Sequence, residues 1–497
     1  MRIKLFLILC MCFSLCACST GFPLTDNIAS QPLPTGVTTL IAPIGEASLN
    51  ELRTETLYLP MYDTLHLSEV QAEVTYSLSK SPAESLTRAL LAYPGDGTVA
   101  PLGGETKLTL YGNNPVEVSG GVCTVNLSAS ALRLDKPTLY VVSQAIANTL
   151  ISLPDIDYVN VLIADKAIGL DISNQIPMGT LNVIKGEDIS AHYQAQTATH
   201  FNNQNTKAET PLLTDATFYY PLADSAGIMS IAKNCFFESK KIDDMAISIL
   251  STLSEGNEAL GSPELPLLIE MLEKPPSIMH ELDAGARVLE LYFSHSIDDM
   301  LSAYKITRTQ WVASITYTLS TFFPNLTGVR IYIGGNAVNT LMLTSDFDSS
   351  INLENSIAQR NHFSSLLYNY TTLYNSTLEP ILTPLPSQSL NHPHSLIIST
   401  ANMLSFPELA LTDADILGLS LNGNCLVVNF ATVVWEQLSK LSPAEVRSFA
   451  FACVNALCEL APVECVQFFV GGEVISTQLG GLDWSGVFMP LYVSDMQ

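Results

Sequence analysis

Cysteines near the end of the chain have residue types and spacing that could bind a metal ion or form a disulfide bond. They are Cys425, Cys453, Cys458 and Cys465. In a repeated pattern described below, the first copy has apolar or aromatic residues at these positions, namely Val122, Ile146, Ile151 and Tyr158. Because a free cysteine behaves as a small buried hydrophobe, we expect core packing. A disulfide is the first alternative and a metal site the second.

The histidines offer little for acid–base catalysis or metal binding. All eight are scattered, and none holds the same place in two copies of the repeat. His392 and His394 form the one close pair, and the neighbouring sequence has no further metal ligands. We therefore expect a loop at this point, without a bound metal.

Two pairs of adjacent carboxylates, Asp243-Asp244 and Asp298-Asp299, could act as acid–base pairs. Each pair stands where a helix is predicted to begin, so helix capping and the helix dipole explain them better. The sequence contains no Gly-x-Ser-x-Gly elbow, phosphate-binding loop, dinucleotide fingerprint or calcium loop. Gly334-Gly335 and Gly471-Gly472 lie between predicted strands and indicate hairpin turns. We predict no catalytic residue, no metal and no cofactor.

A pattern of helix, strand, turn and strand occurs three times in the chain. The copies lie at 141–173, around Val312 and around Ser448. Equivalent turn residues are Asp165-Lys166, Gly335-Asn336 and Gly472-Glu473. The period is far too long for a solenoid. We therefore predict three tandem small domains, called here unit 1 (54–190), unit 2 (212–348) and the more divergent unit 3 (362–497).

Each unit is predicted to fold as a mixed sheet with about two helices packed on it, which is an α/β (α+β) architecture. The predicted strands lie at 56–60, 72–78, 125–128, 217–221, 230–237, 291–294, 365–374 and 428–431. The predicted first helices of the units lie at 83–93, 243–253 and 395–403. Residues 182–212 and 349–361 are read as linkers or loosely packed edges.

Composition limits the classes of function. The chain has 497 residues, of which 47% are hydrophobic, so about three domains of ~100–200 residues can each bury a core. The formal charge of −26 comes from 48 acidic and 22 basic residues. An acidic surface repels phosphate backbones, so nucleic-acid binding is not expected.

The first 18 residues indicate an export signal of the lipoprotein type. Arg2 and Lys4 precede an apolar run that is too short to span a bilayer comfortably. The run ends in Leu15-Cys16-Ala17-Cys18, which predicts lipidation of Cys18; ordinary secretion is the alternative. A diacylglycerol carries two chains, enough for stable anchoring. Residues 19–53 are then predicted to be a flexible tether.

Several short motifs follow one another along the chain, namely LYLP at 57–60, RALL at 88–91, VNLS at 125–128, ANTL at 147–150, VNVLIADKAI at 159–168 and GLDIS at 169–173. Their order and spacing resemble the GerMN domain of bacterial sporulation and spore-germination lipoproteins. The resemblance covers most of unit 1, the second half of unit 3 and scattered parts of unit 2. It implies a fold like the ring-building motifs of sporulation channels and secretion systems, and a non-catalytic scaffold or assembly role at the envelope.

We therefore expect a non-enzymatic, membrane-anchored scaffold or assembly module in sporulation, germination or cell-wall processes. It would lie on the outer face of the cytoplasmic membrane of a Gram-positive bacterium, with protein partners in the envelope. The alternative is a lipoprotein that binds peptidoglycan or a solute. Trp435 and Trp484 would be its exposed aromatics, unless both pack in the core. A peptidoglycan hydrolase is the least favoured hypothesis.

Overall fold

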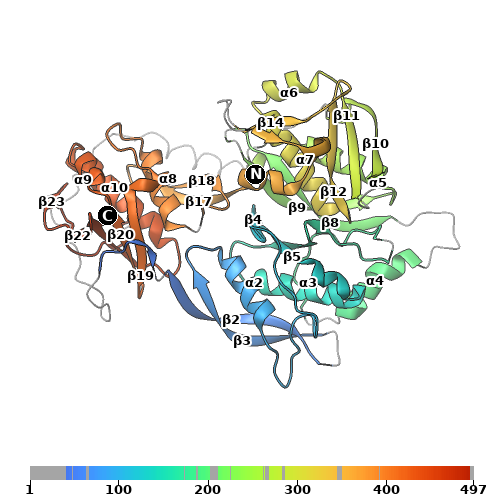
Figure 1. Ribbon diagram of the computed structural model, residues 1–497, viewed down its shortest axis with the longest axis horizontal. Helices are drawn as coiled ribbons and strands as arrows, with labels where there is room; N and C mark the ends of the chain where they lie inside the picture. Colours follow the sequence, from blue (N-terminus) through green and yellow to red (C-terminus); the bar gives the residue numbers. More distant parts are fainter. Residues whose placement is uncertain are drawn as a thin grey trace, which may run out of the picture.

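The computed structural model describes residues 41–47, 49–62, 66–172, 174–185, 189–201, 211–223, 225, 227–260, 262, 268–281, 286–343, 350–390 and 392–492. Small sheets and helices in alternation confirm the predicted mixed α+β architecture (Figure 1). Within the described residues, every helix is too short or too polar to cross a membrane.

Unit 1 combines a long two-stranded hairpin with a four-stranded mixed sheet. Its elements are β2 (Asn50–Pro60), β3 (Leu67–Ser77), α2 (Pro82–Ala92), β4 (Val116–Ser119), β5 (Val122–Leu127), η1 (Ala129–Arg133), α3 (Lys136–Leu150), β6 (Tyr158–Ile163), β7 (Lys166–Ala167) and α4 (Ile189–Phe201). The sheet order is β4-β5-β6-β7, with β5 and β6 parallel. Helix α3 connects these parallel strands and packs against the β2–β3 hairpin as well as β6, so its side chains are buried along most of its length.

Unit 2 repeats this plan. Its elements are β8 (Leu212–Pro221), β9 (Ile228–Phe237), α5 (Ile242–Ser254), η2 (Glu258–Leu260), β10 (Leu272–Glu281), β11 (Ala286–Phe293), α6 (Ile297–Ala303), α7 (Arg308–Phe322), β12 (Leu326–Ile333), β13 (Asn336–Ala337) and β14 (Thr340–Met342). The segment that follows unit 2 contains β15 (Ser350–Asn352), η3 (Glu354–Ser356) and β16 (Ile357–Ala358). Strands β11 and β12 are parallel and α7 connects them, as α3 connects β5 and β6. Strand β16 adds to β12.

Unit 3 forms a separate lobe (Figure 1). The short turns η4 (Arg360–His362) and η5 (Ser364–Leu366) lead into this lobe. Its elements are β17 (Tyr368–Tyr374), β18 (Pro380–Pro386), α8 (Pro393–Leu404), η6 (Asp413–Asp415), β19 (Ile416–Asn422), β20 (Cys425–Phe430), α9 (Thr432–Leu438), α10 (Pro443–Cys458), β21 (Cys465–Val470), β22 (Glu473–Val474), β23 (Gln478–Leu479) and β24 (Leu482–Asp483). Strands β20 and β21 are parallel and α10 lies between them in the chain. Strand β17 and helix α8 correspond to the predicted first strand and first helix.

The starts of the helices follow from local sequence. Ser81 caps α2 by accepting a hydrogen bond from the Glu84 N–H, and Pro82 stands at the first helical position. Reciprocal capping boxes start α7 at Thr307 and α10 at Ser442. The glycine pairs 334–335 and 471–472 join β12 to β13 and β21 to β22 with positive φ, which confirms the predicted hairpin turns.

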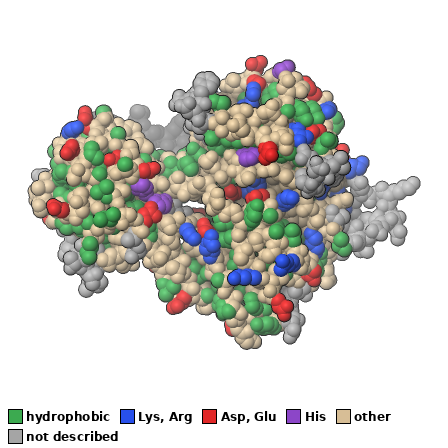
Figure 2. Space-filling view, viewed as in Figure 1, with side chains coloured by type: hydrophobic (Ala, Val, Ile, Leu, Met, Phe, Trp, Pro, Cys, Tyr) green, Lys and Arg blue, Asp and Glu red, His purple; other side chains and the backbone are tan. Residues whose placement is uncertain are grey.

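Units 1 and 2 share one continuous apolar core. A single cluster of buried side chains runs from Leu57 in β2 to Leu367 after η5. A second cluster fills unit 3, and it includes Leu49 and Leu78 from the two ends of the β2–β3 hairpin. The hairpin therefore reaches from unit 1 into the core of unit 3. Figure 2 shows that the unit 3 lobe meets the other two units over a narrow region.

Segments predicted as tether or linkers contain regular structure. Residues 45–53 were assigned to the tether, but β1 (Gly45–Ala47) pairs in parallel with β19, and β2 starts at Asn50. The predicted linker 182–212 contains α4, and 349–361 contains β15, β16 and η4. These segments were misread because their polar composition is typical of loops, whereas strand pairing with distant elements decides their structure.

Candidate functional site at the junction of the units

The predicted site residues lie in different places. Cys18 lies outside the described residues. Cys453 and Cys465 are buried, Cys458 is partly buried, and all three are free thiols, which agrees with core packing. Burial raises the pKa of the Cys458 thiol to about 12. Cys465 stands in register with Cys425 on the neighbouring strand.

The histidine pair lies at the start of α8 rather than in a loop. His392 is the N-cap residue and contacts the Glu46 carboxylate (2.7 Å from Nε2 to Oε1), while His394 contacts Asp413. Among the residues that the structure describes, no group of three or more His, Cys, Asp or Glu side chains could hold a metal ion.

The carboxylate pairs lie in the first turns of α5 and α6, where the helix dipole favours negative charge. They do not cap these helices, because the N-cap residues are Lys241 and Ser296. The capping part of the interpretation was therefore wrong by a few positions. Trp484 is fully buried and packs edge-on against the partly buried Trp435, so these residues do not form an exposed aromatic surface.

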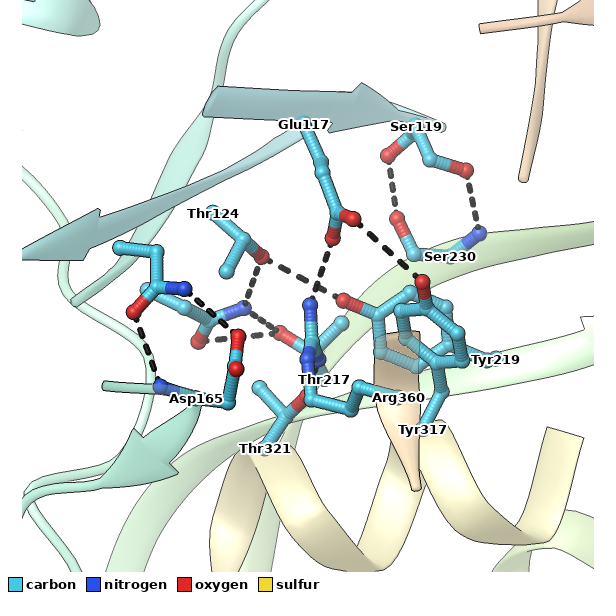
Figure 3. A network of polar contacts seen from close by, with 12 residues as sticks. Glu117, Ser119, Thr124, Asp165, Thr217, Tyr219, Ser230, Tyr317, Thr321 and Arg360 are labelled. Carbon is cyan, nitrogen blue, oxygen red and sulfur yellow. Dashed lines mark hydrogen bonds and ion pairs between the residues drawn. The ribbon is translucent and has the colours of Figure 1, made fainter. Parts of the chain in front are cut away.

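The most elaborate polar site lies where the three units meet (Figure 3). We call it the junction and define it by Glu117, Ser119, Thr124, Thr217, Tyr219, Ser230, Tyr317, Thr321 and Arg360. Strand β4 supplies Glu117 and Ser119 from unit 1. Strands β8 and β9 and helix α7 supply the side chains of unit 2, and η4 supplies Arg360 just before unit 3.

A buried ion pair joins unit 1 to the segment that leads into unit 3. The Arg360 Nη2 donates to the Glu117 Oε2 at 2.6 Å, and its Nη1 donates to the hydroxyl of Thr321 on α7. The Arg360 side chain is 5% exposed and that of Glu117 15%. A buried ion pair of this kind is costly to break, because removing one partner leaves the other charge buried and unpaired.

Two tyrosines complete the environment of this pair. The Arg360 guanidinium lies 4.3 Å from the ring centroid of Tyr317, whose hydroxyl donates to Glu117 at 3.4 Å. The ring of Tyr219 packs against Tyr317 at 4.9 Å between centroids. Burial raises the pKa of the Glu117 carboxyl above its ordinary value, and Arg360 and Tyr317 act in the opposite direction. The charge of Arg360 is therefore stabilised by hydrogen-bond acceptors on units 1 and 2 and by the aromatic face of Tyr317.

A chain of amide and hydroxyl groups continues the contact between units 1 and 2. Asn160 on β6 donates to the Thr217 hydroxyl at 2.9 Å, and Thr180 shares hydrogen bonds with both residues. These side chains are buried. Buried polar groups are costly unless each finds a partner, so this network specifies one way of docking β8 onto the sheet of unit 1.

The turn between β4 and β5 contacts the other two units at once. The Ser119 hydroxyl donates to the Tyr368 carbonyl on β17 at 2.7 Å and accepts from the Ser230 N–H on β9 at 3.1 Å. The Gly120 N–H donates to the Asn369 side chain at 3.1 Å. A Cβ atom at Gly120 would lie 1.9 Å from the Ser230 carbonyl oxygen, so the backbones of units 1 and 2 meet directly here.

Beside the ion pair lies a polar cavity of about 400 Å³. Asn126 and Asp165 line it and bond to each other, the amide donating to the carboxylate at 2.6 Å. Tyr111, at its edge, is 43% exposed. The lining residues are Tyr111, Gly112, Asn113, Asn114, Glu117, Thr124, Asn126, Leu162, Asp165, Arg360, Asn361 and Ser364.

The junction is built to hold units together. Its charges are paired, and its hydroxyls are engaged in hydrogen bonds between units rather than with a general base. Sequence analysis missed it because Arg360 stands in an apparent linker and Glu117 in an edge strand. The one signal in the sequence was Arg360 itself, the single basic residue in the polar stretch 349–361.

Comparison with known proteins gives one family match. Residues 56–169 match the family model Germane, described as sporulation and spore germination. The predicted GerMN-type domain is therefore confirmed in unit 1. No curated protein matches the chain significantly.

Solved structures also match. The tandem GerMN domains of the sporulation protein GerM from Bacillus subtilis share 16% identity, covering 62% of this chain and 99% of that one, with a TM-score of 0.22. The first GerMN domain of the same protein shares 19% identity over 26% of this chain and 93% of that one, with a TM-score of 0.17. A putative lipoprotein from Clostridium perfringens shares 16% identity over 29% and 93%, with a TM-score of 0.18.

Proposed function

Since residues 56–169 form a GerMN-type domain, we propose that this chain is a non-enzymatic scaffold of the cell envelope that acts in sporulation or germination. The observation that carries the proposal is the junction, in which Glu117, Arg360 and Ser119 join three units. Binding between units at fixed positions lets a chain present several surfaces to partners at once. The proposal includes lipidation of Cys18 and location on the outer face of the cytoplasmic membrane.

The test of the scaffold is partner capture from envelopes. The lipidated full chain is expressed in a sporulating Gram-positive host, crosslinked and purified, and co-purified proteins are identified by mass spectrometry. We expect a defined set of envelope proteins, with reduced recovery for Arg360→Met at equal abundance. Recovery of lipids and background proteins alone would count against a scaffold.

The anchor has a separate test. We expect Cys18→Ser to move the protein from the membrane fraction to the soluble fraction, and the wild-type N-terminal peptide to carry a diacylglycerol mass. Cys16→Ser is the matched control, because it changes the neighbouring cysteine while leaving the predicted lipidation site intact. Membrane retention of Cys18→Ser would contradict the anchor.

A second candidate function is binding of a glycan or another hydroxylated solute, which the polar cavity favours. Ligand pockets usually measure ~300–1,000 Å³ and place a few polar groups beside an aromatic or apolar wall. This cavity has amides, the two carboxylates of Glu117 and Asp165, and an exposed tyrosine. Sedimentation with purified cell-wall sacculi at low salt tests it. Binding that Tyr111→Ala abolishes would support this function, and absence of binding would exclude it for peptidoglycan.

A further inference from the structure

The segment just before unit 1 lies on unit 3. Strand β1 (Gly45–Ala47) extends the sheet of unit 3 by pairing in parallel with β19, Gly45 opposite Gly418. Figure 1 shows this blue start of the chain beside β19, just before the β2–β3 hairpin of unit 1. The segment that precedes unit 1 in the sequence therefore packs against unit 3, the last unit of the chain.

Two residues of unit 3, Gly418 and Asn429, contact this segment directly. A Cβ atom at Gly418 would lie 2.4 Å from the Pro43 carbonyl oxygen, so a residue with a side chain would push the segment away. The Asn429 side chain donates to the same oxygen at 2.9 Å, and Pro43 is buried. Since buried carbonyl groups need partners, this bond stabilises the docked position.

The equivalent positions in the other units do not carry glycine. In unit 1, Pro115 stands opposite Asn126, as Gly418 stands opposite Asn429. In unit 2, Lys274 stands opposite Tyr292, the counterpart of Asn429, and the register of β10 shifts just after it, at Pro275 and Pro276. Unit 3 alone has glycine at this point of its edge, and its edge carries the added strand.

The hairpin turn between β21 and β22 of unit 3 lacks the carboxylate that binds the equivalent asparagine side chain in unit 1. In unit 1 the Asn126 amide is bound by the carboxylate of Asp165 in the hairpin turn. Unit 3 has Gly472 at that position; its N–H still donates to the Asn429 side-chain oxygen at 3.0 Å. Without the carboxylate, the Asn429 amide is available to bind Pro43.

Two further side-chain contacts, one from β1 itself and one from the residue just before β2, add to this docking. Glu46 contacts His392 at the start of α8 (2.7 Å), and Leu49 is 6% exposed within the core of unit 3. An ion pair at an exposed site contributes little, so the main contributions come from the backbone pairing and from Leu49.

We propose that the β19 edge of unit 3 is a docking site dedicated to residues 43–47 of the same chain. Unit 3 thereby clamps the segment that leads from the membrane anchor and fixes the point where the chain approaches the membrane; this consequence for the membrane rests on the proposed lipidation of Cys18. The occupant is the chain's own segment, and the role of unit 3 is to hold it.

The first test uses the unmodified full chain. Hydrogen–deuterium exchange should show protected amides in peptides covering Gly45–Ala47, comparable with those of β19. Exchange at the rate of an unstructured peptide would overturn the proposal. This measurement requires no substitution and is independent of lipidation.

The second test is proximity crosslinking. Glu46→Cys/His392→Cys is treated with a short bis-maleimide, in membranes and in detergent, and each single cysteine variant is the control. We expect crosslinking within one chain, and a roughly tenfold fall when Gly418→Val is added. Leu417→Val on the same strand, where the side chain is 41% exposed, should leave the yield unchanged.

The outcomes separate this proposal from the anchor. Crosslinking of protein found in the soluble fraction would support the clamp while showing that lipidation had failed. Equal yields with and without Gly418→Val, in chains with native circular dichroism, would overturn the clamp. If Gly418→Val does not fold, the hydrogen-exchange result decides.

Discussion

At the scale of single residues, the ion pair between Glu117 and Arg360 is the most consequential contact between units. Arg360 reaches unit 1, α7 and two tyrosine rings from a short 3-10 turn. Buried ion pairs add little stability compared with a well-packed apolar pair, but a single unpaired charge is costly. Their value is that they specify one arrangement of the parts that they join.

Arg360→Met should lower the free energy of unfolding by about 3–5 kcal/mol at neutral pH, because it leaves the Glu117 carboxylate buried without its partner. Glu117→Gln should also destabilise, because it leaves the Arg360 charge buried without its carboxylate, but it should cost less, since the glutamine oxygen can still accept from the guanidinium. The double variant Glu117→Gln/Arg360→Met should recover much of the loss. Urea denaturation measures all three. Additive losses in the double variant would show that the two side chains do not interact.

The pH dependence has a defined sign. Burial raises the pKa of Glu117 above 4.5, so the folded chain binds this proton more tightly than the unfolded chain does. The stabilising contribution of the protonated carboxyl is then present below pH 4.5 and is lost as the pH rises through the raised value. Relative to Glu117→Gln, wild type should lose stability across this interval, and Arg360→Met should lose more. A difference between wild type and Glu117→Gln that does not change with pH would contradict this assignment.

At the scale of elements, helices and strands were predictable and their partners were not. Periodicity and capping residues placed α2, α5 and α8 within a few positions, because both are local. Strand β1 was missed because three residues carry no periodic signal and pair with β19, hundreds of positions away. The docking groups of the junction were missed for the same reason: their chemistry appears only when β4, β9 and η4 come together.

The β4–β5 turn provides a matched test of this docking. Gly120 and Gly104 both have positive φ, 53° and 61°, but a Cβ at Gly104 would have no atom within 4 Å. Gly104→Ala should therefore cost only the left-handed strain of about 1–2 kcal/mol. Gly120→Ala should cost more and should speed amide exchange in β9, since its Cβ collides with the Ser230 carbonyl. Equal costs for the two variants, measured by urea denaturation, would show that this turn does not hold unit 2.

At the scale of the whole molecule, the repeat was visible in the sequence but the relation between its copies was not. Units 1 and 2 share one core, and the β2–β3 hairpin carries Leu49 and Leu78 into unit 3. From the sequence alone, the three copies could equally have been independently folded domains joined by flexible linkers. The structure instead predicts one body, in which a partner would meet surfaces at fixed spacing.

Distances between units test this central claim most directly. Spin labels are attached in pairs at Leu132→Cys, Met279→Cys and Val474→Cys, one exposed site in each unit. Among the described cysteines, the two that are only partly buried should compete little, since burial raises the pKa of Cys235 to about 11 and that of Cys458 to about 12. Pulsed electron paramagnetic resonance should give one narrow distance distribution for each pair, broadened by Arg360→Met or Gly120→Ala. Broad distributions in the otherwise unmodified chain would contradict a fixed arrangement of the three units.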